Sequence, residues 1–194
     1  QEVPEGESGK LVHTLDEISV SLVDEITSQR MLSSAEKGTL EVQPNLVTGS
    51  EISKQTIALL RGDAARRNIK IAHVMESENF ALITDAAILK RVLVNTIKNA
   101  VEASIAGDTV TVTCRKSGDA GEFRIHNNAS IPDSVRLQLF YRYYSTKGAN
   151  RGLGTYSMLL FTEKYLRGYL TLETDESAGT TITIALPADV RSNA

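Results

Sequence analysis

The chain has 194 residues, of which 41% are hydrophobic and 23% charged, and its formal net charge is −3 at pH 7. This composition is ordinary for a soluble globular protein, and the length allows one to two domains with a buried core. A slightly acidic chain lacks the basic surface that binds polyanions, so nucleic acid is excluded as an expected partner. The single cysteine, Cys114, excludes an internal disulfide and fits a reducing cytoplasm. We expect no direct membrane contact, because no run of about 18 apolar residues occurs.

The first part of the chain predicts one amphipathic helix, followed by an extended segment with the sequence TLEVQPNLV. Apolar residues recur at spacings of three and four and form one narrow helical stripe, which ends near Leu32 and comprises Leu11, Leu15, Ile18, Leu22 and Ile26. A helix with such a stripe needs a partner. Because no second helix of matching character follows before Gly38, we interpret it as one arm of a helical bundle shared between two chains.

The rest of the chain predicts helices interleaved with antiparallel hairpins. A helix is expected over residues 50–67, capped by a serine near its start, and the segments IKIAHV and FALIT are expected to pair as a hairpin. Asp85 is placed to cap a helix over 86–104, which Gly107 ends. The pattern predicts an α+β fold, a two-layer sandwich with helices on one face of a mixed sheet. The later expected elements are strands DTVTVTC and EFRIH, helices over 135–140 and 155–166, and strands YLTLETD and TTITIAL.

Two asparagines on the helix over 86–104 are the first chemical signal. Asn95 and Asn99 are four residues apart and lie together at the edge of its apolar face. An unpaired amide there costs about 1–3 kcal/mol, and a bound cation with phosphate would satisfy both groups. Hydrogen bonds to neighbouring backbone would satisfy them equally well, so this helix alone leaves both interpretations open.

A segment with glycines before the helix over 155–166 is the second signal. Gly152 and Gly154 let the backbone approach a ligand closely, and the following helix offers its N-terminal amides and its dipole to an anion. Lys147 lies just upstream in the segment STKG, which could fold over phosphates as a lid. An ordinary loop and a solvated lysine explain the same residues, so neither feature is specific by itself.

Four motifs, in their order and spacing, resemble the catalytic ATP-binding domain of sensor histidine kinases. NTIKNA resembles the N box, FYRYYSTKG the F box and lid, RGLGTYS the second glycine box, and AGTTITIALP the strand that ends such domains. Four motifs in register are far more specific than any one of them. The resemblance implies the GHKL, or Bergerat, fold, with the ATP-binding catalytic domain over 38–194. It also implies that residues 1–37 are a linker and the second helix of the dimerisation and phosphotransfer bundle.

The resemblance further implies roles for individual residues. Asn99 would ligate Mg²⁺, Asn95 would support the metal or its water shell, and Lys147 would contact the phosphates of ATP. Thr180 would help to fix adenine through a water molecule. The phosphates would also be held by the residues after the lid, which are Arg151, Gly152, Leu153, Gly154 and Thr155.

The first glycine box departs from the family pattern Asp-x-Gly-x-Gly, in which the Asp accepts a hydrogen bond from the adenine amino group. The corresponding stretch is HNNASIP, with His126 in the Asp place and Asn127 beside it, and both are candidates for the nucleotide site. An Asn carbonyl also accepts from an exocyclic amine, so we expect Asn127 to read adenine while His126 packs at the strand end. The alternative is a degenerate loop that binds nucleotide poorly.

The implied reaction transfers the γ-phosphate of ATP to a histidine on the bundle of a homodimer, for relay to the receiver domain of a response regulator. His13 is expected to be a surface or bundle residue, and the phospho-acceptor histidine to lie outside this chain. The expected location is the cytoplasm, or the cytoplasmic part of a membrane-anchored sensor. Two other interpretations stay open: a GHKL ATPase or protein serine kinase without the bundle helix, and a signalling scaffold that has lost nucleotide binding.

Overall fold

The computed structural model describes residues 19, 22–23, 25–141 and 153–192. The chain divides into two compact units, Gln1–Glu41 and Val42–Ala194. In the first unit residues 25–37 are helical, so the helix continues past Leu32, where we expected it to end. Gly38 follows with a φ of 73°, and the amide of Thr39 donates to the carbonyl of Ser34 at 2.9 Å. A residue in the left-handed region commonly ends a helix. Gly38, and not the last apolar residue of the stripe, therefore sets the end of this helix.

The second unit is built on a five-stranded sheet with the order β2-β4-β5-β7-β6. β2 pairs with β4 in parallel and the other neighbours are antiparallel, so the sheet is mixed, as the sequence predicts. The predicted hairpins β4–β5 and β6–β7 are both present. The strands are β2 (Lys70–Met75), β4 (Thr109–Ser117), β5 (Ala120–Asn127), β6 (Tyr169–Asp175) and β7 (Gly179–Pro187).

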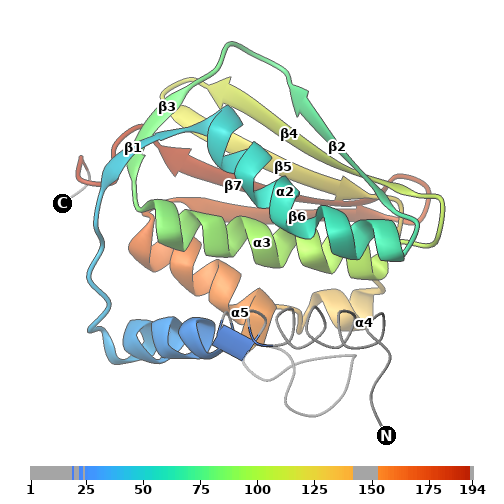
Figure 1. Cartoon of the computed structure of the whole chain (residues 1–194), viewed down its shortest axis with the longest axis horizontal. Helices are drawn as coiled ribbons and strands as arrows, with labels where there is room; N and C mark the ends of the chain where they lie inside the picture. Colours follow the sequence, from blue (N-terminus) through green and yellow to red (C-terminus); the bar gives the residue numbers. More distant parts are fainter. Residues whose placement is uncertain (1–18, 20–21, 24, 142–152, 193–194) are drawn as a thin grey trace, which may run out of the picture. The chain divides into compact units, whose positions relative to one another are not determined.

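Helices α2 (Gly49–Arg66), α3 (Ala86–Ala103) and α5 (Leu153–Leu160) lie together on one side of this sheet (Figure 1). The core fills the space between the two layers, and its fully buried side chains include Leu89, Leu93, Ile97, Phe123 and Ile184. This arrangement confirms the predicted two-layer α+β fold. None of the helices that the structure describes combines the length and the hydropathy that a membrane span requires.

The hairpin expected between IKIAHV and FALIT does not form. β3 (Ala81–Thr84) instead pairs antiparallel with β1 (Asn45–Thr48), in a separate two-stranded sheet. Phe80, just before β3, is buried with its ring edge-on to Phe123, 5.6 Å between centroids. Burying this ring against β5 directs the chain away from β2. The predicted hairpin is wrong because a short apolar run carries no information about its partner strand.

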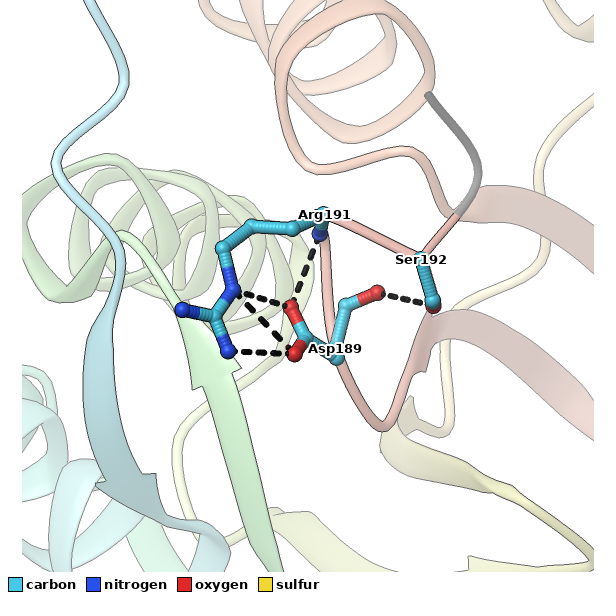
Figure 2. Close-up of polar contacts among 3 residues, drawn as sticks. All are labelled: Asp189, Arg191 and Ser192. Atoms are coloured by element: carbon cyan, nitrogen blue, oxygen red, sulfur yellow. Dashed lines mark hydrogen bonds and ion pairs between the residues drawn. The ribbon is translucent and has the colours of Figure 1, made fainter.

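The C-terminal residues complete the pairing of β3. The amide of Ile83 donates to Ala188 at 2.8 Å and the amide of Val190 donates to Ile83 at 2.9 Å. Figure 2 shows the turn that follows, in which the Arg191 guanidinium donates to both carboxylate oxygens of Asp189. These side-chain bonds, with one from the Arg191 backbone amide, lower the pKa of Asp189 to about 2. The turn therefore keeps its ion pair into acid solution.

The helix ends follow local chemistry only in part. Asp85 caps α3 as predicted, because its Oδ1 accepts from the amides of Ala87 and Ile88. The serine cap predicted for α2 is wrong: its N-cap is Thr48, with no side-chain capping bond. The helix predicted over 155–166 begins as α5 and continues as a π-helix, η1 (Phe161–Tyr165). The short helix predicted over 135–140 lies earlier, as α4 (Asp133–Arg136).

Candidate functional site

Asn95 joins α3 to the first turn of α5. Its side chain is 8% exposed, and its Nδ2 donates to the hydroxyl of Ser157 at 3.2 Å. The same hydroxyl donates to the carbonyl of Gly154 at 2.8 Å. Beside this chain of bonds, Thr96 Oγ1 donates to the sulfur of Met158 at 3.0 Å. The polar edge of α3 is therefore fastened to the N-terminal end of α5. The first amides of an α-helix have no partner within the helix and suit an anion.

Asn99 lies one turn further along α3 and is half-buried. Its side chain makes no hydrogen bond to any residue that the structure describes, so its amide oxygen is available to a ligand. Mg²⁺ takes oxygen ligands, and beside phosphates it takes only one or two of them from the protein. Within the described ranges no group of three His, Cys, Asp or Glu residues could hold a metal by itself. The amide oxygens of Asn95 and Asn99 fit an ion that arrives with a phosphate-bearing ligand.

Asn127 ends β5 on the face that the helices cover. Side chains alternate along a strand, so Asn127 shares the face of the buried residues Phe123 and Ile125. It is 4% exposed, and its Nδ2 has no hydrogen-bond partner among the residues that the structure describes. His126 points to the opposite face, where its Nδ1 lies 3.0 Å from the hydroxyl of Thr181. Of the two candidates in the altered glycine box, only Asn127 faces the helix layer.

The HNNASIP segment is held to the β6–β7 hairpin by hydroxyl groups. Thr180, directly opposite Asn127, donates to the carbonyl of Ala129 at 2.7 Å and lies 2.9 Å from the hydroxyl of Thr174. Thr174 Oγ1 accepts from the amide of Ile131 at 2.9 Å. Gly179 makes the close approach of hairpin and loop feasible, because a Cβ there would lie 2.3 Å from the Asn127 carbonyl oxygen. The loop is thus fixed in place although it lacks the glycines of the family pattern.

The end of β5 is tied to the C-terminal end of α3. Asn128 Nδ2 donates to Asp108 Oδ1 at 3.1 Å, and Asp108 Oδ2 accepts from the amide of Ile105 at 3.0 Å, just past the helix. Asn99 lies one turn before the end of this helix. Asn127 and Asn99 therefore belong to the same end of the two-layer structure.

Some residues implied by the sequence lie at α5, and others cannot be placed. Leu153, Gly154 and Thr155 form the first turn of α5. Lys147, Arg151 and Gly152 lie outside the described residues. Sequence reasoning missed Ser157, Asp108 and Thr174, whose contacts join positions far apart in the chain. The only local signal for Ser157 is its place one helical turn after Gly154.

A second cluster of reactive residue types lies away from this site. Cys114 Sγ is 2.9 Å from Ser53 Oγ and 3.7 Å from His73 Nε2. Burial raises the pKa of the Cys114 thiol, and burial together with the charge of Lys54 lowers the pKa of His73. A buried thiol with a raised pKa is a poor nucleophile, so we interpret this cluster as part of the core.

Residues 84–190, just over half of the chain, match the sequence model of the histidine kinase-, DNA gyrase B- and HSP90-like ATPases. Sensor protein DegM of Bacillus sp. (strain B21-2) is 28% identical over 141 residues, which are 72% of this chain and 37% of DegM. The chain spans about a third of the length of the curated relatives that it matches.

Two solved structures share the fold. Full-length ShkA in complex with AMPPNP has a TM-score of 0.77 at 19% identity, over 96% of this chain and 40% of ShkA. Histidine kinase ThkA in complex with response regulator protein TrrA has a TM-score of 0.70 at 17% identity, over 99% of this chain and 54% of ThkA. The sequence match, the fold and the asparagine-bearing helix lead to one conclusion. The chain belongs to the family of histidine kinase-, DNA gyrase B- and HSP90-like ATPases.

Proposed function

We propose that this chain is the ATP-binding catalytic region of a two-component sensor histidine kinase. In this proposal it transfers the γ-phosphate of ATP to a histidine on a dimerisation bundle, and the receiver domain of a response regulator takes the phosphate from there. The relatives support it, because DegM is a sensor protein, ShkA was crystallised with an ATP analogue and ThkA with a response regulator protein.

The observation that carries the proposal is the bond chain from Asn95 through Ser157 to Gly154. It holds the Asn95 carboxamide of α3 beside the start of α5, and Asn99 lies one turn further along α3. In this proposal the edge of α3 that bears both carboxamides binds the metal ion, and the N-terminal end of α5 binds the phosphates. A nucleotide with its metal ion combines the two charges that such a site needs.

The proposed roles divide between the two ends of the nucleotide. Asn99 ligates Mg²⁺ and Asn95 supports its water shell, while Asn127 accepts from the adenine amino group and Thr180 assists through a water. When bound, Mg²⁺ neutralises charge on the phosphate oxygens. A neutral imidazole is already nucleophilic, so no general base is needed and the chain only positions the groups and balances their charge. Lys147 and the segment Arg151, Gly152, Leu153, Gly154 and Thr155 hold the phosphates.

Residues 1–37 are, in this proposal, a linker and the second helix of the dimerisation bundle, and 38–194 are the catalytic domain. The exposed apolar side chains of the first helix support a homodimer, because Leu22, Val23 and Ile26 are each more than half exposed. Such a stripe is buried when two chains associate. We propose a cytoplasmic location, alone or as the cytoplasmic part of a membrane-anchored sensor.

Calorimetric titration of this chain with ADP and Mg²⁺ tests the nucleotide site. We expect saturable binding that requires Mg²⁺, and at least about tenfold weaker binding in Asn99→Ala, which loses a metal ligand. Asn79→Ala is the matched control, because Asn79 is exposed and lies outside the proposed site. A scaffold without nucleotide would give neither heat nor a thermal shift at millimolar ADP, and that result would refute the proposal.

Phosphotransfer distinguishes a histidine kinase from an ATPase or serine kinase with the same pocket. In a protein that joins this chain to a histidine-bearing bundle, we expect acid-labile phosphate from ATP in the unsubstituted form and none in Asn99→Ala. Acid-stable phosphate on serine, or hydrolysis without phosphoprotein, would favour the other classes.

A further inference from the structure

One buried side-chain nitrogen in the described part of the chain has no hydrogen-bond partner, and it is Nδ2 of Asn127. The side chain is 4% exposed and lies at the end of β5 on the helix-covered face. The hydroxyl directly across from it, on Thr180, is turned to Ala129 and Thr174 and leaves this amide unpaired. An unpaired buried donor is unfavourable, so the position suits a ligand that brings an acceptor as well as a donor.

A carboxamide presents an acceptor and a donor on two groups of nearly the same shape. Adenine carries an amino donor at position 6 beside the N1 acceptor, whereas guanine carries an oxygen acceptor at position 6 beside an N1–H donor. Rotating the amide by half a turn exchanges the two patterns. A carboxylate offers only acceptors, so it can donate neither to adenine N1 nor to the guanine oxygen.

We propose that Asn127 lets the nucleotide site accept both purines, so that adenine and guanine nucleotides bind with similar affinity. The inference rests on the proposed function, because it requires the base to reach the end of β5. No hydrogen bond from any described residue fixes the orientation of the Asn127 amide, so either orientation is open to it. The carboxamide is therefore the group that sets purine specificity here.

The test compares the binding of ADP and GDP, each with Mg²⁺, by isothermal titration calorimetry. For the unsubstituted chain we expect dissociation constants within about tenfold of each other. Asn127→Asp should weaken the binding of both ADP and GDP by at least about tenfold, because a carboxylate cannot donate to adenine N1 or to the guanine oxygen. Asn79→Asp is the matched control: Asn79 is exposed, and its Oδ1 accepts from the amide of Ser50, a bond that Asp keeps.

A buried carboxylate could prevent Asn127→Asp from folding, so IDP supplies an independent measurement on the unsubstituted chain. Inosine shares the position-6 oxygen and the N1–H of guanine without its 2-amino group, and we expect IDP within about tenfold of ADP. A preference for ADP over GDP and IDP of about a hundredfold would overturn this inference and leave the proposed function standing. Unchanged affinities for ADP and GDP in folded Asn127→Asp would also overturn it. Failure of all three nucleotides to bind would refute the proposed function together with the inference.

Discussion

Substituting Ser157 with alanine tests the polar link between α3 and α5. The change removes two hydrogen bonds, from Asn95 Nδ2 at 3.2 Å and to the Gly154 carbonyl at 2.8 Å. Because Asn95 and Ser157 are 8% and 4% exposed, water does not readily replace the lost partner of the amide. A buried group left unpaired costs about 1–3 kcal/mol, so we expect the free energy of unfolding to fall by about 2 kcal/mol.

Urea unfolding followed by circular dichroism measures this loss, with Ser104→Ala as the control. Ser104 Oγ also donates to a backbone carbonyl, that of Ala100, at 2.8 Å. The Ala100 carbonyl keeps the amide of Ser104 as a donor, so this substitution should cost less than about 1 kcal/mol. The same samples should bind ADP more weakly only for Ser157→Ala. Equal stability of the two variants, or unchanged ADP affinity in Ser157→Ala, would refute the role given to this link.

Three further predictions concern stability and ionisation. Phe80→Ala should lower the free energy of unfolding, measured in urea, by about 3–5 kcal/mol. The ring is 5% exposed and packs edge-on against a buried phenylalanine of β5. A loss below about 1 kcal/mol would contradict this packing. Gly179→Ala should lower the thermal midpoint measured by calorimetry, because φ is +77° and a Cβ would lie 2.3 Å from the Asn127 carbonyl oxygen; an unchanged midpoint would show that the loop is not held there. The carboxyl of Asp189 has its pKa lowered to about 2, so its ion pair with Arg191 is complete above about pH 4 and is lost as the pH falls through 2. An NMR titration should find this pKa raised toward the ordinary value in Arg191→Ala, which keeps only the backbone amide bond. An ordinary value in the unsubstituted chain would contradict the ion pair.

The parts of the fold that follow from neighbouring residues were predictable from the sequence. The cap at Asp85 and the β4–β5 and β6–β7 hairpins depend on short-range chemistry, and each is present. The pairing of β3 with β1 depends on where Phe80 is buried, which alternation within one strand does not reveal. Likewise, no local sequence pattern indicates that α5 continues as a π-helix.

The site divides in the same way. The spacing of Asn95 and Asn99 predicts that they share one edge of a helix, but the partner of Asn95 is Ser157, 62 residues away, and no periodicity links the two. The orientation of the altered glycine box was predictable from the sequence. Side chains alternate along a strand, so Asn127 shares the face of Phe123 and Ile125. Asn127 is therefore assigned to the helix-covered face and His126 to the other.

In the proposed site the carboxamides of α3 and the end of β5 face one magnesium nucleotide. Side-chain amide resonances of a ¹⁵N-labelled chain, followed during titration with ADP and Mg²⁺, test it directly. We expect the signals of Asn95, Asn99 and Asn127 to shift together along one saturable curve, while the signal of the exposed Asn79 stays in place. Binding that leaves the Asn99 and Asn127 amides unshifted would contradict this arrangement, because the nucleotide would then occupy another part of the molecule.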